Sequence, residues 1–150
     1  MDTELVLAVI DRDWQVFIAQ AARLGLGAPR RTGVEIGIPV RPAGTGEDYL
    51  AILECDGYDV AAPLLDFANP EHPDQRGGPC WPRMGSAPMN QITIGNRSVP
   101  IICTPGTRGY HLHISHVHEA HPRTTWRLSA VATLLHRFLT QMGPYQGRGV

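Results

Sequence analysis

The stretch Gly33-Val34-Glu35-Ile36-Gly37-Ile38-Pro39-Val40 decides the fold class. Its apolar residues alternate with small or polar ones, which is the two-residue period of a strand with one buried face. Because Pro39 donates no ladder hydrogen bond, we expect this strand to lie at a sheet edge or to end there. A turn at 42–46 leads to a second strand at 49–55, and a short third strand follows at 64–67. These connections are too short for crossover helices, so an antiparallel meander is predicted.

Helices are predicted on both sides of this sheet in the sequence. Residues 3–24 repeat apolar side chains at spacings of three and four, and Gly25 follows as a residue that can end a helix. Residues 123–142 show the same periodicity and predict a C-terminal helix. The polar tail at 143–150 has no such pattern, and we expect it to fray.

The segment between the third strand and the last helix has no regular pattern. Residues 68–100 contain several proline and glycine pairs that break elements, around one brief strand at 91–94. Residues 104–122 form a histidine-rich loop. The predicted order is therefore a helix, a sheet with a long loop over 32–103, the histidine-rich loop and a second helix. This order predicts a single α+β domain over residues 1–150.

Composition limits the classes of function. The chain has 150 residues, 43% of them hydrophobic and 18% charged, which is typical of one globular domain. A net charge of -1 argues against nucleic acid or an anionic membrane as the main partner. No apolar run reaches the length of a membrane span, and residues 1–4 lack the basic start of a signal peptide, so a cytoplasmic location is expected. Three cysteines without a Cys-x-x-Cys pair exclude a disulfide framework and a cysteine-only zinc site.

All 13 basic residues are arginine, and the sequence contains no lysine. GC-rich coding is the simpler explanation, because it also favours glycine, alanine and proline. A functional explanation is that a protein that handles amine-reactive intermediates benefits from having no amine side chain, since guanidinium stays protonated and is not nucleophilic.

Cys103 is the first candidate for chemistry. It lies between an apolar extended segment and a loop that begins at residues 104–106, where a side chain can be held by the sheet and still reach solvent. Arg108 and several histidines follow closely, and positive neighbours favour the nucleophilic thiolate. A buried structural cysteine is the alternative for any single thiol. Cys55, at the end of the second strand, fits that alternative, and Cys80 is ambiguous.

The histidines form the second candidate site. Five of the seven fall within residues 111–121. On an extended segment, His111 and His113 would point the same way, and neutral imidazole is a common metal ligand. A zinc site made from two or three of His111, His113, His116 and His118 is therefore one alternative. The other is a polar loop whose histidines form hydrogen bonds or buffer a neighbouring thiolate.

A spaced set of residues links these features to a known family. The positions are Tyr58, Pro63, Phe67, Ile102, Cys103 and Trp126. The first three keep the spacing of Tyr-Pro-x-x-Pro-Pro-x-x-x-Phe, the signature of the third strand in ubiquitin-conjugating enzymes, although Asp59 and Ala62 replace two prolines. In that family an Ile-Cys pair and a later tryptophan follow. The chain thus resembles the UBC-like family over roughly residues 3–142, most of all the prokaryotic members found beside ubiquitin-like proteins and activating enzymes in bacterial operons.

The resemblance implies a fold, an activity and partners. The fold is an N-terminal helix, a four-stranded antiparallel meander, a long irregular loop with the cysteine, and a C-terminal helix. The activity is transfer of a ubiquitin-like C-terminus from an activating enzyme, through a thioester on Cys103, to an amine of a protein substrate. It needs no cofactor, and a charged enzyme without lysine cannot modify its own side chains. A bacterial antiviral defence or stress-response pathway is the implied setting.

One part of the family pattern is missing. The family has a His-Pro-Asn motif before the cysteine, whose asparagine supports the loop or the oxyanion during attack. Here Asn96 lies close to the corresponding offset, and His111 or His113 could give the polar support instead. Two other functions stay open: a non-catalytic UBC-like binding module with a buried Cys103, and a metal-binding protein that uses the histidine cluster.

Overall fold

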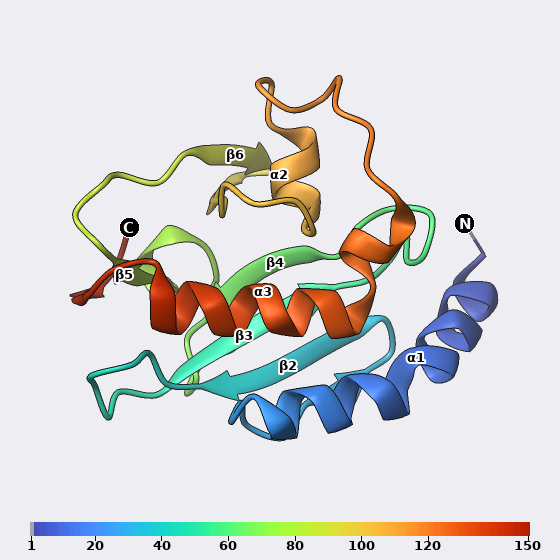
Figure 1. Ribbon diagram of the computed structural model, residues 1–150, viewed down its shortest axis with the longest axis horizontal. Coiled ribbons are helices and arrows are strands. Elements are labelled where there is room, and N and C mark those ends of the chain that lie inside the picture. The colour runs from blue at the N-terminus through green and yellow to red at the C-terminus, as the bar shows by residue number, and fades with distance from the viewer. Residues whose placement is uncertain (1) are drawn as a thin grey trace.

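Two helices and a four-stranded sheet form the body of the protein. The computed structural model describes residues 2–150 and is drawn in Figure 1. The elements of the body are α1 (Thr3–Arg23), β1 (Arg30–Thr32), β2 (Glu35–Val40), β3 (Tyr49–Glu54), β4 (Leu64–Ala68) and α3 (Leu128–Gln141). The strands are antiparallel in the order β1-β2-β3-β4. The predicted N-terminal helix, antiparallel meander, C-terminal helix and α+β class are confirmed.

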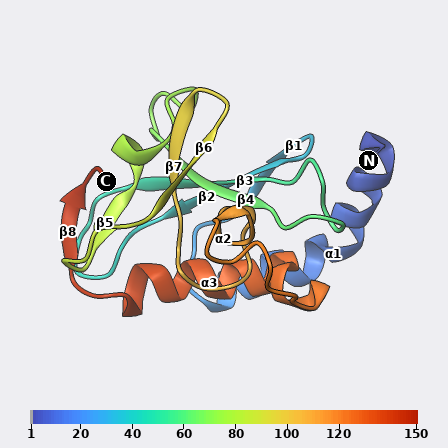
Figure 2. The ribbon, with the colours of Figure 1, turned by 90° about the horizontal axis from the view of Figure 1, so that it is seen from above.

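The remaining elements come between β4 and α3 in the sequence, or after α3. They are η1 (Gly78–Cys80), β5 (Pro82–Met84), β6 (Gln91–Ile94), β7 (Arg97–Pro100), α2 (Arg108–Leu112), η2 (Arg123–Trp126) and β8 (Tyr145–Arg148). The strand predicted at 91–94 is present as β6, but it pairs only with β7 and not with the main sheet. Figure 2 shows this hairpin on the side of the sheet opposite to α3.

The core lies where α1 and α3 pack on one face of the sheet. Alternation along β2 turns Ile36 and Ile38 to this face, and neither has any exposed surface. Phe17 of α1 and Leu135 of α3 are fully buried as well. No helix within residues 2–150 is both long enough and apolar enough to cross a membrane.

Pro39 lies in the part of β2 that has a neighbouring strand on one side only. The short strand β1, which the sequence pattern did not predict, pairs only with residues 35–37. Beyond that point the outer side of β2 has no strand, and Pro39 accepts a hydrogen bond at 2.8 Å from the Gly27 amide. Because Pro39 needs no donor on that side, it lies in an edge portion of β2, as expected.

The prediction that residues 143–150 fray is wrong. Four of these residues form β8, which pairs with β5. The Tyr145 hydroxyl lies 2.6 Å from the Tyr49 hydroxyl and 2.6 Å from a carboxylate oxygen of Glu47. The guanidinium of Arg148 lies 3.9 Å from the centre of the Tyr49 ring. The tail is ordered because its aromatic and cationic side chains find partners distant in the sequence.

Two further boundaries differ from the prediction. The last helix begins at Leu128 rather than at 123, because residues 123–126 form the η2 turn. The Leu128 amide donates at 3.0 Å to the Tyr58 hydroxyl, so the start of the helix is capped from the loop between β3 and β4. The histidine-rich segment is not entirely a loop, because it contains α2.

Candidate functional site

Cys103 is the one exposed thiol of the chain. Cys55 has no exposed surface, and its burial raises the pKa of the thiol to about 12. Cys80 is 8% exposed, its burial also raises its pKa, and it donates to the Gln75 carbonyl. The binding-module alternative required a buried Cys103, and that is not the observed state of this residue.

The position of Cys103 is set by the β6–β7 hairpin and the residues just after it. We call residues 90–126 the thiol-bearing segment. Beyond the last ladder pair, the Ile101 amide donates at 2.9 Å to the Asn90 carbonyl and extends the hairpin by one step. Ile101 and Ile102 are both buried and anchor the chain, so Cys103 is the first residue to leave the protein interior.

Asn90 is the polar neighbour of the thiol. Its side-chain Nδ2 lies 3.9 Å from Sγ of Cys103, a long contact that directs an amide donor toward the sulfur. Asn96, the residue expected in this role, lies instead in the two-residue turn at the opposite end of the hairpin. The whole length of β6 and β7 therefore separates Asn96 from Cys103.

Sequence reasoning missed Asn90, although a pattern that points to it is present. Gly95 and Asn96 form a two-residue turn, and Gly95 has a φ of 61°, which a type II′ hairpin turn requires at its first position. Counting outward from that turn pairs Asn90 with Ile101 and places the asparagine beside the chain that leads to Cys103. Offset along the sequence alone could not show this, because the hairpin folds the chain back on itself.

An apolar groove of 190 Å³ opens beside Cys103. Its walls include Met84, Met89, Phe138 of α3 and Met142 just after that helix. Unbranched thioether side chains adapt readily to the shape of a bound group. The thiol thus lies at the rim of a groove that can receive an apolar group.

A second set of side chains surrounds Glu119. Its carboxylate accepts from the Tyr110 hydroxyl at 2.7 Å and contacts Nδ1 of His116 at 2.9 Å and Nε2 of His121 at 3.1 Å. The His116 ring stacks on Tyr110 with centroids 4.0 Å apart. These hydrogen bonds, from Tyr110 first and then the two histidines, lower the pKa of Glu119 to about 2. The same hydrogen bond, burial and the charges of Glu119 and Cys103 raise the pKa of Tyr110 to about 12.

The residues that were expected to act on Cys103 are placed differently. Arg108 donates instead to the Asp56 carboxylate at 2.7 Å and to the Ala62 carbonyl at 3.0 Å. His111 accepts from the Gly106 amide at 3.3 Å through Nε2, and burial is the main cause that lowers its pKa. The contacts of Arg108 thus do not support the idea that it favours the thiolate.

The four histidines of the zinc alternative are not gathered at one point. His111 lies in α2 and His113 caps it, so the extended segment assumed for this pair is not present. The His111 ring packs edge to face on Trp126, with ring centroids 5.2 Å apart. The rings of His113 and His116 have centroids 5.8 Å apart, and His118 is exposed. Over residues 2–150, no three histidine, cysteine, aspartate or glutamate side chains are grouped so that they could hold a metal ion.

The signature residues that are not cysteine have structural contacts. The Tyr58 hydroxyl donates at 2.7 Å to Asp13 of α1, and Phe67 is buried against Trp81 with ring centroids 4.8 Å apart. Trp126 lies in η2 rather than in the helix, and its Nε1 donates at 3.2 Å to the Asp59 carbonyl. Tyr58 and Trp126 thus connect the loop between β3 and β4 to α1 and η2, whereas Phe67 of β4 is part of the core.

Comparison of the chain with models of known protein families, with curated proteins and with solved structures gave no match.

Proposed function

We propose that this protein is a conjugating enzyme for a ubiquitin-like protein, with a UBC-like fold and Cys103 as the acyl acceptor. The observation that carries the proposal is the exposed Cys103 thiol beside the Asn90 amide, on a chain whose two other thiols are buried. The order of an N-terminal helix, a four-stranded meander, a cysteine-bearing segment and a C-terminal helix supports it. The short motifs around Tyr58 and Cys103 support it as well.

The proposed reaction consists of two acyl transfers. In the first, the Cys103 thiolate attacks the carbonyl carbon of the thioester that joins a ubiquitin-like C-terminus to the activating enzyme. A new carbon–sulfur bond forms, the old one breaks, and the thiol of the activating enzyme leaves as a thiolate. In the second, an uncharged amine of the protein substrate attacks the carried thioester. The Cys103 thiolate leaves, the amine nitrogen gives a proton to solvent, and an amide bond remains.

Asn90 has the chemistry to assist both steps. Each step passes through a tetrahedral intermediate in which one carbon carries both Sγ and a negatively charged oxygen. That oxygen is therefore close to the sulfur and to a donor beside it. In acyl-transfer enzymes, removal of one donor to such an oxygen costs about 2.7–4 kcal/mol of transition-state stabilisation. The asparagine role that the family resemblance assigned to Asn96 therefore passes to Asn90.

The implied partners are an activating enzyme, a ubiquitin-like protein and a protein substrate. The sequence contains no lysine, so no ε-amine of this chain competes with the substrate for the carried thioester. The groove beside Cys103 would take the residues that precede the transferred carboxyl group.

The experiment is a charging assay with the cognate activating enzyme, ATP and the ubiquitin-like protein. The wild type is expected to form an adduct that thiol reductants cleave, and Cys103→Ala is expected to form none. Cys103→Ser should form an adduct that survives the reductant, because an oxygen ester replaces the thioester. Cys80→Ala is the matched control and should charge normally.

Transfer to an amine tests the role of Asn90. We expect Asn90→Ala to slow discharge about 10²-fold or more, while Asn96→Ala discharges at the wild-type rate. Charging of Cys103→Ala would show that the nucleophile is assigned wrongly.

A further inference from the structure

The β6–β7 hairpin carries Asn90 and Cys103 at its open end, but it is not part of the main sheet. Its four ladder pairs, from Gln91↔Pro100 to Ile94↔Arg97, join only β6 to β7. Figure 2 shows it lying over the face of the sheet that α3 does not cover. Side-chain contacts must therefore determine where the hairpin lies relative to the body.

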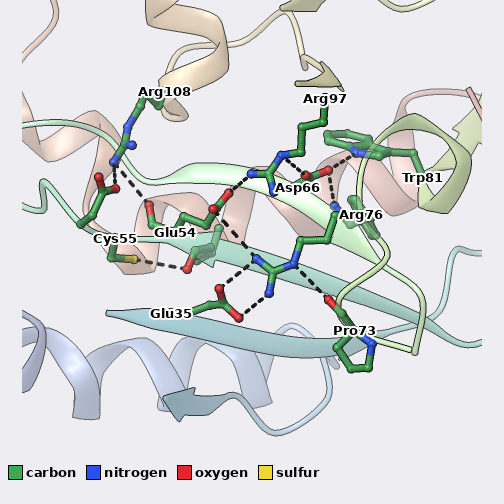
Figure 3. Close-up of polar contacts among 12 residues, drawn as sticks. Glu35, Glu54, Cys55, Asp66, Pro73, Arg76, Trp81, Arg97 and Arg108 are labelled. Atoms are coloured by element: carbon green, nitrogen blue, oxygen red, sulfur yellow. Dashed lines mark hydrogen bonds and ion pairs between the residues drawn. The ribbon is translucent and has the colours of Figure 1, made fainter. Parts of the chain in front are cut away.

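Arg97, at the turn end of the hairpin, makes the polar contacts with the sheet. Its Nη2 donates to Glu54 of β3, and its Nε lies 3.3 Å from Oδ2 of Asp66 in β4. Figure 3 shows the guanidinium between these two carboxylates. The Nε and Oδ2 atoms are both buried, face each other without hydrogen-bond alignment and have no other partner.

Asp66 is the partner of Arg97 whose position is fixed by other hydrogen bonds. Its side chain has no exposed surface, and its Oδ1 accepts from the Phe67 amide and from Nε1 of Trp81, each at 2.8 Å. These two donors fix the carboxylate, and a buried charge of this kind needs a cation nearby. Arg97 is that cation, so a fixed point of the sheet determines where the turn end of the hairpin can lie.

A second arginine on the same face gives a contrast. Arg76 donates to both carboxylate oxygens of Glu35, at 2.8 and 2.7 Å, and lies 3.9 Å from Glu54. It comes from the loop after β4 and not from the hairpin. The two arginines therefore belong to one network of charges, but only Arg97 connects that network to the thiol-bearing segment.

We infer that Arg97 is a positioning residue, which holds the hairpin on Asp66 and Glu54 so that Asn90 and Cys103 are fixed at its other end. The purpose of this positioning rests on the proposed function, whereas the anchoring itself can be measured without any partner protein. The rest of the attachment is apolar packing, with Val99 fully buried in the core, and no ladder hydrogen bond ties the hairpin to the sheet, so loss of the anchor is expected to make local opening of the hairpin more frequent.

The test is native-state hydrogen exchange of the Ile101 amide, which bonds to Asn90 at the end of the hairpin far from Arg97. We expect Arg97→Gln to accelerate this exchange about tenfold, the factor for loss of a charge-assisted hydrogen bond. The amides of β3 should keep their wild-type rates. Arg76→Gln is the matched control and should leave the Ile101 amide unchanged.

Two results would overturn the inference: an unchanged Ile101 rate in Arg97→Gln, or an equal acceleration in Arg76→Gln. If Arg97→Gln destabilises the whole protein, the exchange experiment uses Glu54→Gln instead. This variant changes the less buried of the two carboxylates that contact Arg97 and keeps the fully buried Asp66. A faster Ile101 amide with unchanged β3 amides then supports the inference, and an unchanged Ile101 amide refutes it.

The charging assay adds a separate test of the positioning role. Arg97→Gln is expected to form the Cys103 adduct more slowly than Arg76→Gln does. Accelerated exchange with normal charging would refute positioning and leave the proposed function intact. A wild-type protein that does not charge would remove the proposed function, while the exchange measurement would still decide whether Arg97 anchors the hairpin.

Discussion

The body of the protein and its thiol-bearing segment are held in different ways. In the body, α1 and α3 bury large apolar side chains against the sheet, and Phe17, Phe67 and Leu135 have no exposed surface. The segment of residues 90–126 has fewer fully buried side chains and is joined to the body by polar contacts of Arg97, Arg108 and Trp126, while Glu119 connects residues within the segment. Stability is thus distributed over many contacts in the body, whereas the geometry around Cys103 depends on a few groups.

The largest expected effect on stability comes from the core of the body, into which Trp81 packs from the segment between η1 and β5. Trp81→Ala removes a fully buried ring that packs on Phe67 and Phe138 and donates to Asp66. We expect a loss of about 3–5 kcal/mol in the free energy of unfolding, measured by urea denaturation. Val16→Ala, at an exposed position of α1, is the control and should change stability by less than about 0.5 kcal/mol. Similar losses in the two variants would contradict the packing described for the body.

The next effect concerns a single hydroxyl that joins two helices. Tyr58→Phe removes the donor to Asp13 of α1 and the acceptor for the Leu128 amide of α3. Because that amide is buried, we expect a cost of about 1–3 kcal/mol by the same measurement. Tyr145→Phe also loses a hydroxyl with two partners, but near exposed Glu47, and should cost less. An equal cost would show that burial of the Leu128 amide does not matter.

The smallest effect is confined to the thiol-bearing segment. The folded-state pKa of Glu119 is about 2, below its ordinary value of 4.5. Its contribution to stability is therefore fully present above about pH 4.5 and is lost as the pH falls through about 2. We expect the Tyr110 and His116 ring resonances to broaden over this interval in the wild type, with little change in the amides of the body.

Glu119→Gln tests whether that carboxylate is responsible. The variant should lack the acid-dependent change of the Tyr110 ring between pH 4.5 and 2, because its side chain does not titrate. The same acid dependence in both proteins would show that another group causes it.

Local patterns predicted the body well because its elements are long and periodic. The alternation around Ile36 and the helical spacing over 3–24 each follow from side chains a few residues apart. Strand β1 has no such alternation, since Arg30, Arg31 and Thr32 are all polar, and its existence depends on pairing with β2. Strand β8 was missed for the same reason, because its partner β5 lies about sixty residues earlier.

The features of the candidate site also differ in whether they depend on neighbouring residues or on segments distant in the sequence. The exposed cysteine at the end of an apolar run could be predicted from neighbouring residues. The Glu119 hydrogen bonds and the direction of Arg108 could not, because each depends on how separate segments pack. Asn90 is intermediate: the Gly95-Asn96 turn fixes its register, and this pattern was present in the sequence but was not used.

The two ends of the chain leave the molecule at opposite ends of its long axis, with the start of α1 on one side and Val150 beside β5 on the other (Figure 1). Copies joined head to tail would therefore extend as a string. A fluorescent donor and acceptor attached at the two ends would report the length of the domain, and a changed separation would reveal unpairing of β8 from β5, whose Met84 lines the groove beside Cys103.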